Sequence, residues 1–353
     1  MAEVGVAEDA EPATLGAFDV IVDARSPGEF ALDHVPGAIN LPVLTDAERA
    51  EVGTIYVQES RFKARRVGGA YVAKNVAAYL DTAMAHWPAS MKVLVYCWRG
   101  GMRSGAMAVI LAQVGWRTSV LSGGYRTYRR RVSRRLYDGE PLKQVALLDG
   151  HTGSGKTEVL NRLPEHGVQV LDLEGLAEHR GSLLGGLPGR PQPSQKLFES
   201  RLLAAIEGLD PARPVVIEAE SSKVGERALP PVVWSAMAAA PRIELLAPAE
   251  QRARYLAGAY AELGRDAETL IGLLGRLPDR PGRKRIETWT QMVREGALEA
   301  LAADLIEAHY DPAYRRSSRK DERAMLGAVA LERLDSEGFA RAAIRVAALA
   351  GAV

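Results

Sequence analysis

The sequence predicts an α/β protein with two parallel-sheet domains. Along its 353 residues, short apolar runs alternate with helical patterns, first up to residue 121 and again from Val145 onward. Such alternation is typical of parallel strands joined by helices. In each half a glycine-rich loop directly follows an apolar run, and ligands of open parallel sheets bind beyond the carboxyl ends of the strands. We therefore expect one candidate site in each domain.

The spacing of apolar residues predicts the individual elements. In the first half we predict strands at 20–23, 91–96 and 119–121 and helices at 75–87 and 105–115. In the second half we predict strands at 145–148 and 215–220 and a helix at 158–163. The predicted domains are residues 1–128 and 143–353, joined by an arginine-rich linker helix at 129–142.

The composition indicates a globular protein of a reducing compartment. Hydrophobic residues make up 47% of the chain and charged residues 25%, with a net charge of +1; these are ordinary values for a soluble domain. A single cysteine excludes an internal disulfide. Residues 1–18 lack the pattern of a signal peptide, and no apolar stretch is long enough to span a bilayer. We expect a cytoplasmic protein without a membrane partner.

Cys97 is the candidate catalytic residue of the first half. It follows the predicted strand 91–96 and precedes two glycines, an arginine and a helix. Loop N–H groups, the helix dipole and Arg103 would each stabilise a thiolate and lower the pKa of the thiol. The rest of the expected donor-binding loop is Trp98, Arg99, Gly100, Gly101, Arg103 and Ser104. The alternative is a buried structural cysteine.

The segments around this loop resemble rhodanese-like domains. Residues 23–30 (DARSPGEF), 34–42 (HVPGAINLP) and 121–125 (LSGGY) match signatures of that family in the right order. The resemblance implies that Cys97 carries a persulfide and that Asp23, Arg25 and His34 hold the loops. Five residues separate Cys97 from Arg103, one more than in typical persulfide loops. Cysteine-dependent phosphatases have this wider spacing, so we expect room for a phosphate-like donor.

The second half opens with a complete phosphate-binding motif. Residues 150–157 (GHTGSGKT) match G-x-x-x-x-G-K-[ST] between a predicted strand and a predicted helix. Backbone N–H groups there can wrap a diphosphate, Lys156 can neutralise it, and Thr157 can hold Mg²⁺. The expected diphosphate contacts are Gly150, Thr152, Gly153, Ser154, Gly155, Lys156 and Thr157. The guanine-recognition motif Asn-Lys-x-Asp does not occur, which argues against a GTPase.

Other polar residues of the second half are further candidates. Glu218 and Glu220 end the predicted strand 215–220, where carboxylates can organise a metal ion of unknown identity. His179 and Arg180 lie in a polar, glycine-containing stretch, and His179 can act as a base or contact a phosphate. The alternative is that this stretch is a plain surface connection.

The arginine-rich segment is a candidate nucleic-acid surface. Residues 123–137 contain six arginines and no acidic residue, and their apolar side chains are spaced as one stripe of a helix. Phosphates would be bound by Arg126, Arg129, Arg130, Arg134 and Arg135. The alternative is a solvated linker helix.

Both halves together resemble the tRNA 2-selenouridine synthase family. The resemblance rests on CWRGGMRS at 97–104, GHTGSGKT at 150–157, HRGS at 179–182, QPSQK at 192–196 and DPAY at 311–314. It implies a rhodanese-like domain fused to a P-loop NTPase-like domain, which replaces the sulfur of wobble 2-thiouridine in tRNA with selenium. Selenophosphate from a supplying protein would donate selenium, and geranyl diphosphate would form an S-geranylated intermediate.

Two other functions fit the same motifs. One is a rhodanese-type sulfurtransferase coupled to an ATP-using kinase-like domain. The other is a non-catalytic, phosphate-sensing module that binds tRNA. A geranyl adduct followed by selenium incorporation is expected of the synthase alone. The sequence leaves open whether Cys97 binds selenium covalently and whether a nucleotide also binds the loop 150–157.

Overall fold

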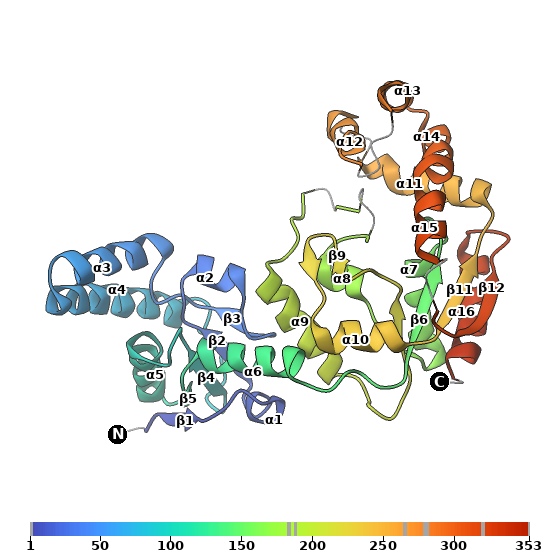
Figure 1. Cartoon of the computed structure of the whole chain (residues 1–353). Helices are drawn as coiled ribbons and strands as arrows, with labels where there is room; N and C mark the ends of the chain where they lie inside the picture. The colour runs from blue at the N-terminus through green and yellow to red at the C-terminus, as the bar shows by residue number, and fades with distance from the viewer. Residues whose placement is uncertain are drawn as a thin grey trace. The chain divides into compact units, whose positions relative to one another are not determined.

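The computed structural model describes residues 3–181, 185–186, 189–263, 267–277, 282–318 and 322–351. The chain forms two compact units (Figure 1). The first unit contains residues up to Asp138 together with 199–204, and the second contains 139–198 together with 205–353. Each unit is built around a five-stranded sheet whose strand pairs are all parallel. The predicted α/β class is therefore confirmed.

The sheet of the first unit has the strand order β1-β5-β4-β2-β3. Its strands are β1 (Gly5–Ala7), β2 (Val20–Asp23), β3 (Ile39–Asn40), β4 (Lys92–Tyr96) and β5 (Arg117–Leu121). The central strand β4 is buried over residues 93–96, since its apolar side chains are covered on both faces of the sheet. Its carboxyl end leads directly into the loop that begins at Cys97.

The helices of the first unit start and stop at clear sequence signals. They are α1 (Pro12–Leu15), α2 (Pro27–Leu32), α3 (Asp46–Gln58), α4 (Arg61–Asp81), α5 (Met102–Val114) and α6 (Tyr125–Tyr137). Capping boxes at Ser26 and Thr45 start α2 and α3. Gly115, with a φ of 119°, ends α5. The core between helices and sheet includes Val22, Val95, Met107 and Leu111.

The helix predicted at 75–87 has wrong boundaries. It is the last part of α4, which begins at Arg61, ends at Asp81 and pairs with α3 (Figure 1). The helix buries a narrow stripe of mostly small residues, Ala64, Gly68, Val72 and Val76. Because small and apolar residues also occupy many of the other positions, the buried stripe does not stand out as an apolar periodicity in the sequence.

The arginine-rich segment also differs from the expected linker at 129–142. Helix α6 begins at Tyr125, ends at Tyr137 and is grouped with the first unit. Its apolar stripe is buried as the spacing predicts, at Tyr125, Tyr128, Val132 and Leu136. The helix is therefore a packed element of the first unit with an arginine-bearing outer face.

The sheet of the second unit has the strand order β12-β11-β6-β8-β7. Its strands are β6 (Val145–Gly150), β7 (Gln169–Leu171), β8 (Val215–Glu218), β11 (Arg242–Leu246) and β12 (Met325–Ala330). Outside this sheet, β9 (Lys223–Val224) and β10 (Arg227–Ala228) form a short antiparallel pair. Strand β6 lies in the middle and is buried along its whole length. Leu148 of β6 pairs with Glu218, so β8 ends beside the phosphate-binding motif.

Helices cover this sheet and also form a separate group. Around the sheet lie α7 (Lys156–Leu160), a 3-10 turn (Leu163–His166), α8 (Leu173–Ala177), α10 (Pro231–Ala239) and α16 (Ser336–Ala350). The residues of α9 (Gln195–Glu207) are divided between the two units. Between the neighbouring strands β11 and β12 the chain forms α11 (Ala249–Leu263), α12 (Ala267–Leu274), α13 (Arg283–Arg294), α14 (Leu298–Leu305), a π-helical turn (Ile306–Tyr310) and α15 (Asp311–Ser318). In the described ranges no helix is long and apolar enough to cross a membrane.

The helices between β11 and β12 are here called the helical insertion (residues 247–324). Figure 1 shows α11 to α14 gathered to one side of the strands. They have a hydrophobic core of their own, which includes Leu270, Trp289, Leu301, Leu305 and Tyr310. The insertion is therefore a small helical body attached to the second sheet.

Candidate functional site

The Cys97 loop is shaped by glycines and by the turn that follows β5. Gly100 and Gly124 have φ angles of 65° and 58°, and a Cβ on Gly124 would overlap the carbonyl oxygen of Cys97. The N–H of Tyr125 donates to that carbonyl at 2.8 Å, and the N–H of Arg126 donates to Trp98 at 3.3 Å. These contacts fix the loop between the end of β4 and the start of α5.

Cys97 is 4% exposed, and its sulfur accepts several hydrogen bonds. Burial raises the pKa of the thiol, but the Ser104 hydroxyl, 3.2 Å from the sulfur, lowers it. Backbone N–H groups of Ser104 and Arg99 and the charge of Arg103 act in the same direction, and the net pKa lies below its usual value. The loop therefore favours a thiolate, the nucleophilic form of cysteine.

Arg103 is held by a carboxylate that the sequence did not indicate. Its guanidinium lies 2.7 Å from Glu29 of α2, which also pairs with Arg49 at 3.2 Å. Burial raises the pKa of Glu29, yet the two arginines bring it below the usual value. Arg103 therefore pairs with Glu29 in addition to acting on the Cys97 sulfur. Hydrogen bonds from Ser104 lower the pKa of the thiol more than the charge of Arg103 does.

A buried polar network supports the loop from behind. Arg25 pairs with Asp23 at 2.6 Å, and both side chains are almost fully buried. The Arg25 guanidinium stacks on the Tyr125 ring at 4.0 Å, and the Tyr125 hydroxyl donates to Asp33 at 2.6 Å. Trp98 packs against Tyr125 with 5.2 Å between ring centres and stays 37% exposed. This arrangement fits the expected architectural role of Asp23 and Arg25.

The phosphate-binding motif has the geometry that its glycines predict. Gly153 and Gly155 have φ angles of 81° and 77°. A Cβ on Gly155 would overlap the Phe339 ring, and one on Gly153 would lie 2.8 Å from Leu256. The Lys156 ammonium folds back over the loop and donates to the Gly150 carbonyl at 3.0 Å. The glycines therefore allow the tight backbone turns that lead into α7.

Ser154 is an unsatisfied polar group inside this loop. Its side chain is 1% exposed, and its hydroxyl has no hydrogen-bond partner in the described part of the chain. A buried hydroxyl without a partner costs free energy. A phosphate oxygen bound in the loop would supply the missing partner.

Residues of the helical insertion hold the first residues of this loop. Asp311 accepts two hydrogen bonds of 2.8 Å from Arg252 and lies 2.8 Å from His151. Arg252 also donates to the Thr152 carbonyl at 3.3 Å, and the ring of Tyr314 lies 4.0 Å from that of His151. Burial raises the pKa of Asp311, but Arg252 and His151 keep it below its usual value. We call these four side chains the Asp311 clamp.

Three glutamates gather beside Lys156 and Thr157. Glu174, which the sequence did not indicate, accepts a 3.2 Å hydrogen bond from Thr157 and also bonds Glu220. Burial and mutual repulsion raise the pKa of Glu174 and Glu220 to about 7, and that of Glu218 to about 8, although Lys156 lowers each of them. The cluster therefore retains protons near neutral pH.

The other polar candidates lie next to this cluster. The backbone N–H of His179 donates to the Glu174 carbonyl at 3.0 Å, and a Cβ on the nearby Gly181 would overlap carboxylate oxygens of Glu174 and Glu220. His179 forms an isolated bridge with Gly186, and its ring lies against the backbone of Gly225. Burial lowers the pKa of His179. The backbone N–H of Arg180 donates to Gly185 at 2.8 Å. Ser182, the last residue of the HRGS segment, lies outside the described residues.

The arginines of α6 divide into paired and exposed side chains. Arg129 contacts Asp33 at 3.8 Å and pairs with Glu199. Arg134 lies 3.2 Å from Glu11 and stays exposed, and Arg126, Arg130 and Arg135 are exposed as well. Of the five predicted phosphate contacts, Arg129 is thus the one most occupied by carboxylates of the protein itself.

Ser104→Ala should move the titration of the Cys97 thiol to higher pH, because it removes the largest of the interactions that favour the thiolate. Since Cys97 is the chain's single cysteine, the rate of iodoacetamide labelling against pH reports on this thiol alone. Arg103→Gln should shift the curve less. Identical curves for Ser104→Ala and the unmodified protein would contradict the assignment.

Asp311→Asn should weaken binding of inorganic diphosphate about tenfold, equal to about 1.4 kcal/mol. The variant removes the carboxylate that holds His151 and Arg252, so the loop loses its fixed shape. Isothermal titration calorimetry measures the affinity. Glu250→Gln, which breaks an exposed ion pair of the same insertion, is the matched control. Equal affinities in both variants would show that the clamp does not shape the loop.

Comparison with known proteins supports both halves of the chain. Residues 9–131 match the model of the rhodanese-like domain, and residues 143–272 match that of the tRNA 2-selenouridine synthase AAA domain. The tRNA 2-selenouridine synthase of Shewanella denitrificans is 32% identical over 84% of this chain and 78% of its own length. Those of Aeromonas salmonicida (34% identical; 83% and 86%) and Hahella chejuensis (32% identical; 85% and 86%) are similar to the same extent. The chain belongs to the tRNA 2-selenouridine synthase family.

Proposed function

We propose that the protein replaces the sulfur of wobble 2-thiouridine in tRNA with selenium, in two steps at two sites. The proposal rests on the chemical difference between two loops that can each bind an anion, the Cys97 loop and the loop 150–157. One has a buried thiol of lowered pKa, and the other has Lys156 and no thiol. A step that handles a phosphate-bound selenium donor beside a thiolate fits the first loop, and a step that expels a diphosphate fits the second.

The loop 150–157 would carry out geranylation. The sulfur of 2-thiouridine attacks C1 of geranyl diphosphate, the C–O bond breaks, diphosphate leaves with the electron pair, and the N3 proton is released. Loop N–H groups, Lys156 and the Ser154 hydroxyl would stabilise the charge that develops on the leaving diphosphate. Alkylation turns a poor leaving group, the thiocarbonyl sulfur, into a thiol that can depart.

The Cys97 loop would handle selenophosphate. Its spacing gives room for a tetrahedral phosphate, and its N–H groups and Arg103 are the candidate contacts for the phosphate oxygens. Cys97 would orient the donor, since its buried sulfur lies within the loop whose N–H groups would bind the phosphate oxygens. The selenium of selenophosphate then attacks C2 of the nucleobase, the C2–S bond breaks and the geranyl thiol leaves. Water cleaves the remaining Se–P bond and phosphate is released.

Mg²⁺ is a proposed companion of the diphosphate. The Thr157 hydroxyl and the Glu174 carboxylate, 3.2 Å apart, are oxygen ligands of the kind that Mg²⁺ takes. In the described part of the chain, no three His, Cys, Asp or Glu side chains are placed to hold a metal by themselves. Oxygens of the diphosphate would therefore complete the coordination, and the ion would neutralise charge on the leaving group.

The tRNA would reach the first unit through the exposed face of α6. Arg126, Arg130, Arg134 and Arg135 offer guanidinium groups to backbone phosphates. A separate protein would supply selenophosphate, and a cytoplasmic location follows from the tRNA substrate.

The complete reaction tests the proposal. Purified protein is incubated with 2-thiouridine tRNA, geranyl diphosphate and selenophosphate, and the nucleosides are followed by mass spectrometry. We expect S-geranyl-2-thiouridine first and 2-selenouridine afterwards. An ATP-dependent sulfur transfer without a geranyl adduct would instead favour a sulfurtransferase, and tRNA binding without any product would favour a non-catalytic module.

Cys97→Ala should lower selenium incorporation about 10³-fold or more, because the thiol that orients the donor is gone. Geranylation should continue at the normal rate, since the loop 150–157 is unchanged. Supplying pre-geranylated tRNA isolates the selenium step. Normal selenation by this variant would remove Cys97 from the mechanism.

Lys156→Ala should lower geranylation about 10²–10³-fold, because the cation that faces the diphosphate is lost. Selenation of pre-geranylated tRNA should stay near normal. Lys143→Ala, which removes an exposed lysine paired with Glu140, is the control for charge and folding. An equal loss of both half-reactions would contradict the division into two sites.

A further inference from the structure

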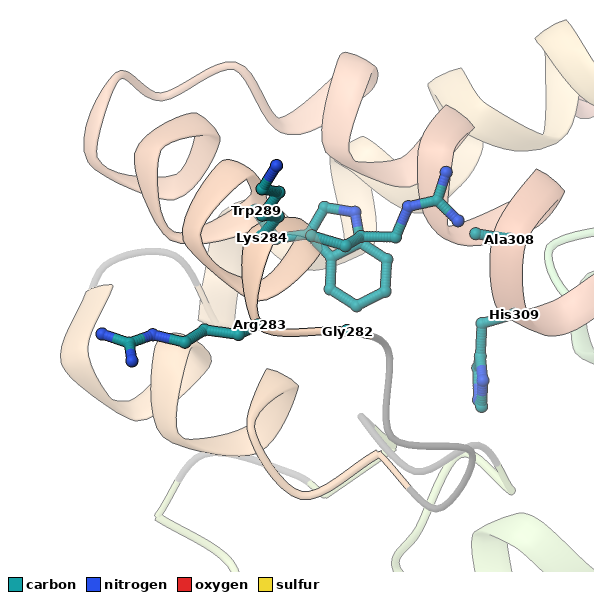
Figure 2. A pocket seen from close by; sticks show the side chains of 7 residues that line it. Gly282, Arg283, Lys284, Trp289, Ala308 and His309 are labelled. Atoms are coloured by element: carbon teal, nitrogen blue, oxygen red, sulfur yellow. The ribbon is translucent and has the colours of Figure 1, made fainter.

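A basic pocket lies on the helical insertion, away from both anion loops in the sequence. Its volume is about 480 Å³, and it is lined by Gly282, Arg283, Lys284, Arg285, Trp289, Ala308 and His309. These described lining residues include three permanent cations and a histidine, and no carboxylate. Figure 2 shows the Trp289 indole between Gly282 and the segment that carries Ala308 and His309.

The carboxylate of Asp304 holds both Trp289, at the bottom of this pocket, and Arg285, one of its cations. The buried Trp289 donates its indole N–H to Asp304 at 2.5 Å, and Arg285 lies 3.4 Å from the same carboxylate oxygen. Arg283 pairs with Glu287 at 3.0 Å, and in Figure 2 it points away from His309. Lys284 has no ion-pair partner within the described ranges. The pocket thus combines an oriented arginine with an unpaired lysine over a rigid floor.

A second cavity of the insertion has the opposite charge. It measures about 790 Å³, and its charged lining residues are Glu250, Glu299, Glu307, Asp311 and a single arginine, Arg315. Surface charges that serve only solubility are usually interspersed. Here basic and acidic residues line two separate cavities of one small helical body, so the basic pocket is the one that favours an anion.

We propose that the pocket formed by Lys284, Arg285 and His309 over Trp289 binds a backbone phosphate of the tRNA substrate. The proposal rests on the proposed function, which makes tRNA the polyanion that this enzyme must hold. Lysine and arginine are the usual partners of nucleic-acid phosphates, and such contacts position the chain without reading its sequence. Because Trp289 is fully buried, it supports the pocket and does not stack on a base.

The test is a tRNA-binding titration at several salt concentrations. In Lys284→Gln combined with Arg285→Gln, two charges are removed while hydrogen-bonding capacity is retained. We expect about tenfold weaker binding near 0.1 M salt, and a plot of log affinity against log salt that is shallower by about one to two units. The matched control is Arg341→Gln combined with Arg345→Gln, which removes two exposed arginines from α16. Thermal unfolding checks that both variants are folded.

The possible results test the role of the pocket and the proposed function separately. A weaker affinity and a shallower slope in the pocket variant alone would support the pocket. An unchanged titration, or an equal loss in the control variant, would overturn it. If the unmodified protein binds 2-thiouridine tRNA no better than it binds a DNA duplex of equal charge, the proposed function is contradicted, whatever the pocket variant shows. Catalytic assays on the same samples show whether the two half-reactions persist at saturating tRNA.

Discussion

Both candidate sites depend on glycine backbone that lies closer to its neighbours than any side chain permits. Gly124 packs against the carbonyl of Cys97, and Gly155 packs against the ring of Phe339. At each position the φ angle is positive, so glycine is needed both for the backbone conformation and for the space. These contacts bring N–H groups to the carboxyl end of a central strand, where an anion can be bound without a large surrounding cavity.

The two loops balance their charge in different ways. Around Cys97, a buried sulfur is stabilised by Ser104 and backbone N–H groups, while the nearby Arg103 is partly neutralised by Glu29. Around Lys156, three carboxyls share protons because burial and repulsion disfavour their full ionisation. The first loop is thus arranged to hold a negative sulfur. The second holds carboxyls that retain protons near neutral pH.

The helical insertion connects distant parts of the chain to the second loop. Asp311 and Arg252 come from its two ends, yet they meet at His151 and Thr152. They can do so because β11 lies next to β6 and parallel to it, so the insertion begins beside the loop that follows β6. The same insertion presents a basic pocket and an acidic cavity as separate surfaces. It therefore shapes the loop, and its basic pocket is the surface that we propose for the polyanion.

Local patterns in the sequence were sufficient to predict the α/β class, strand β2 and the position of both loops. The Cys97 run and the GHTGSGKT motif are contiguous, so strand, loop and helix start can be read within about ten residues. The exact extent of α4 could not be read, because its buried stripe consists largely of small residues.

Only the tertiary structure decided which distant side chains complete the sites. Glu29, Glu174, Arg252 and Asp311 reach their loops through strand order and helix packing, and a single sequence carries no signal of those long-range contacts. The same holds for Arg129, which resembles its neighbours in the sequence but is held by carboxylates in the fold. A contiguous motif fixes backbone conformation, whereas the charge around it depends on which segments the sheet brings together.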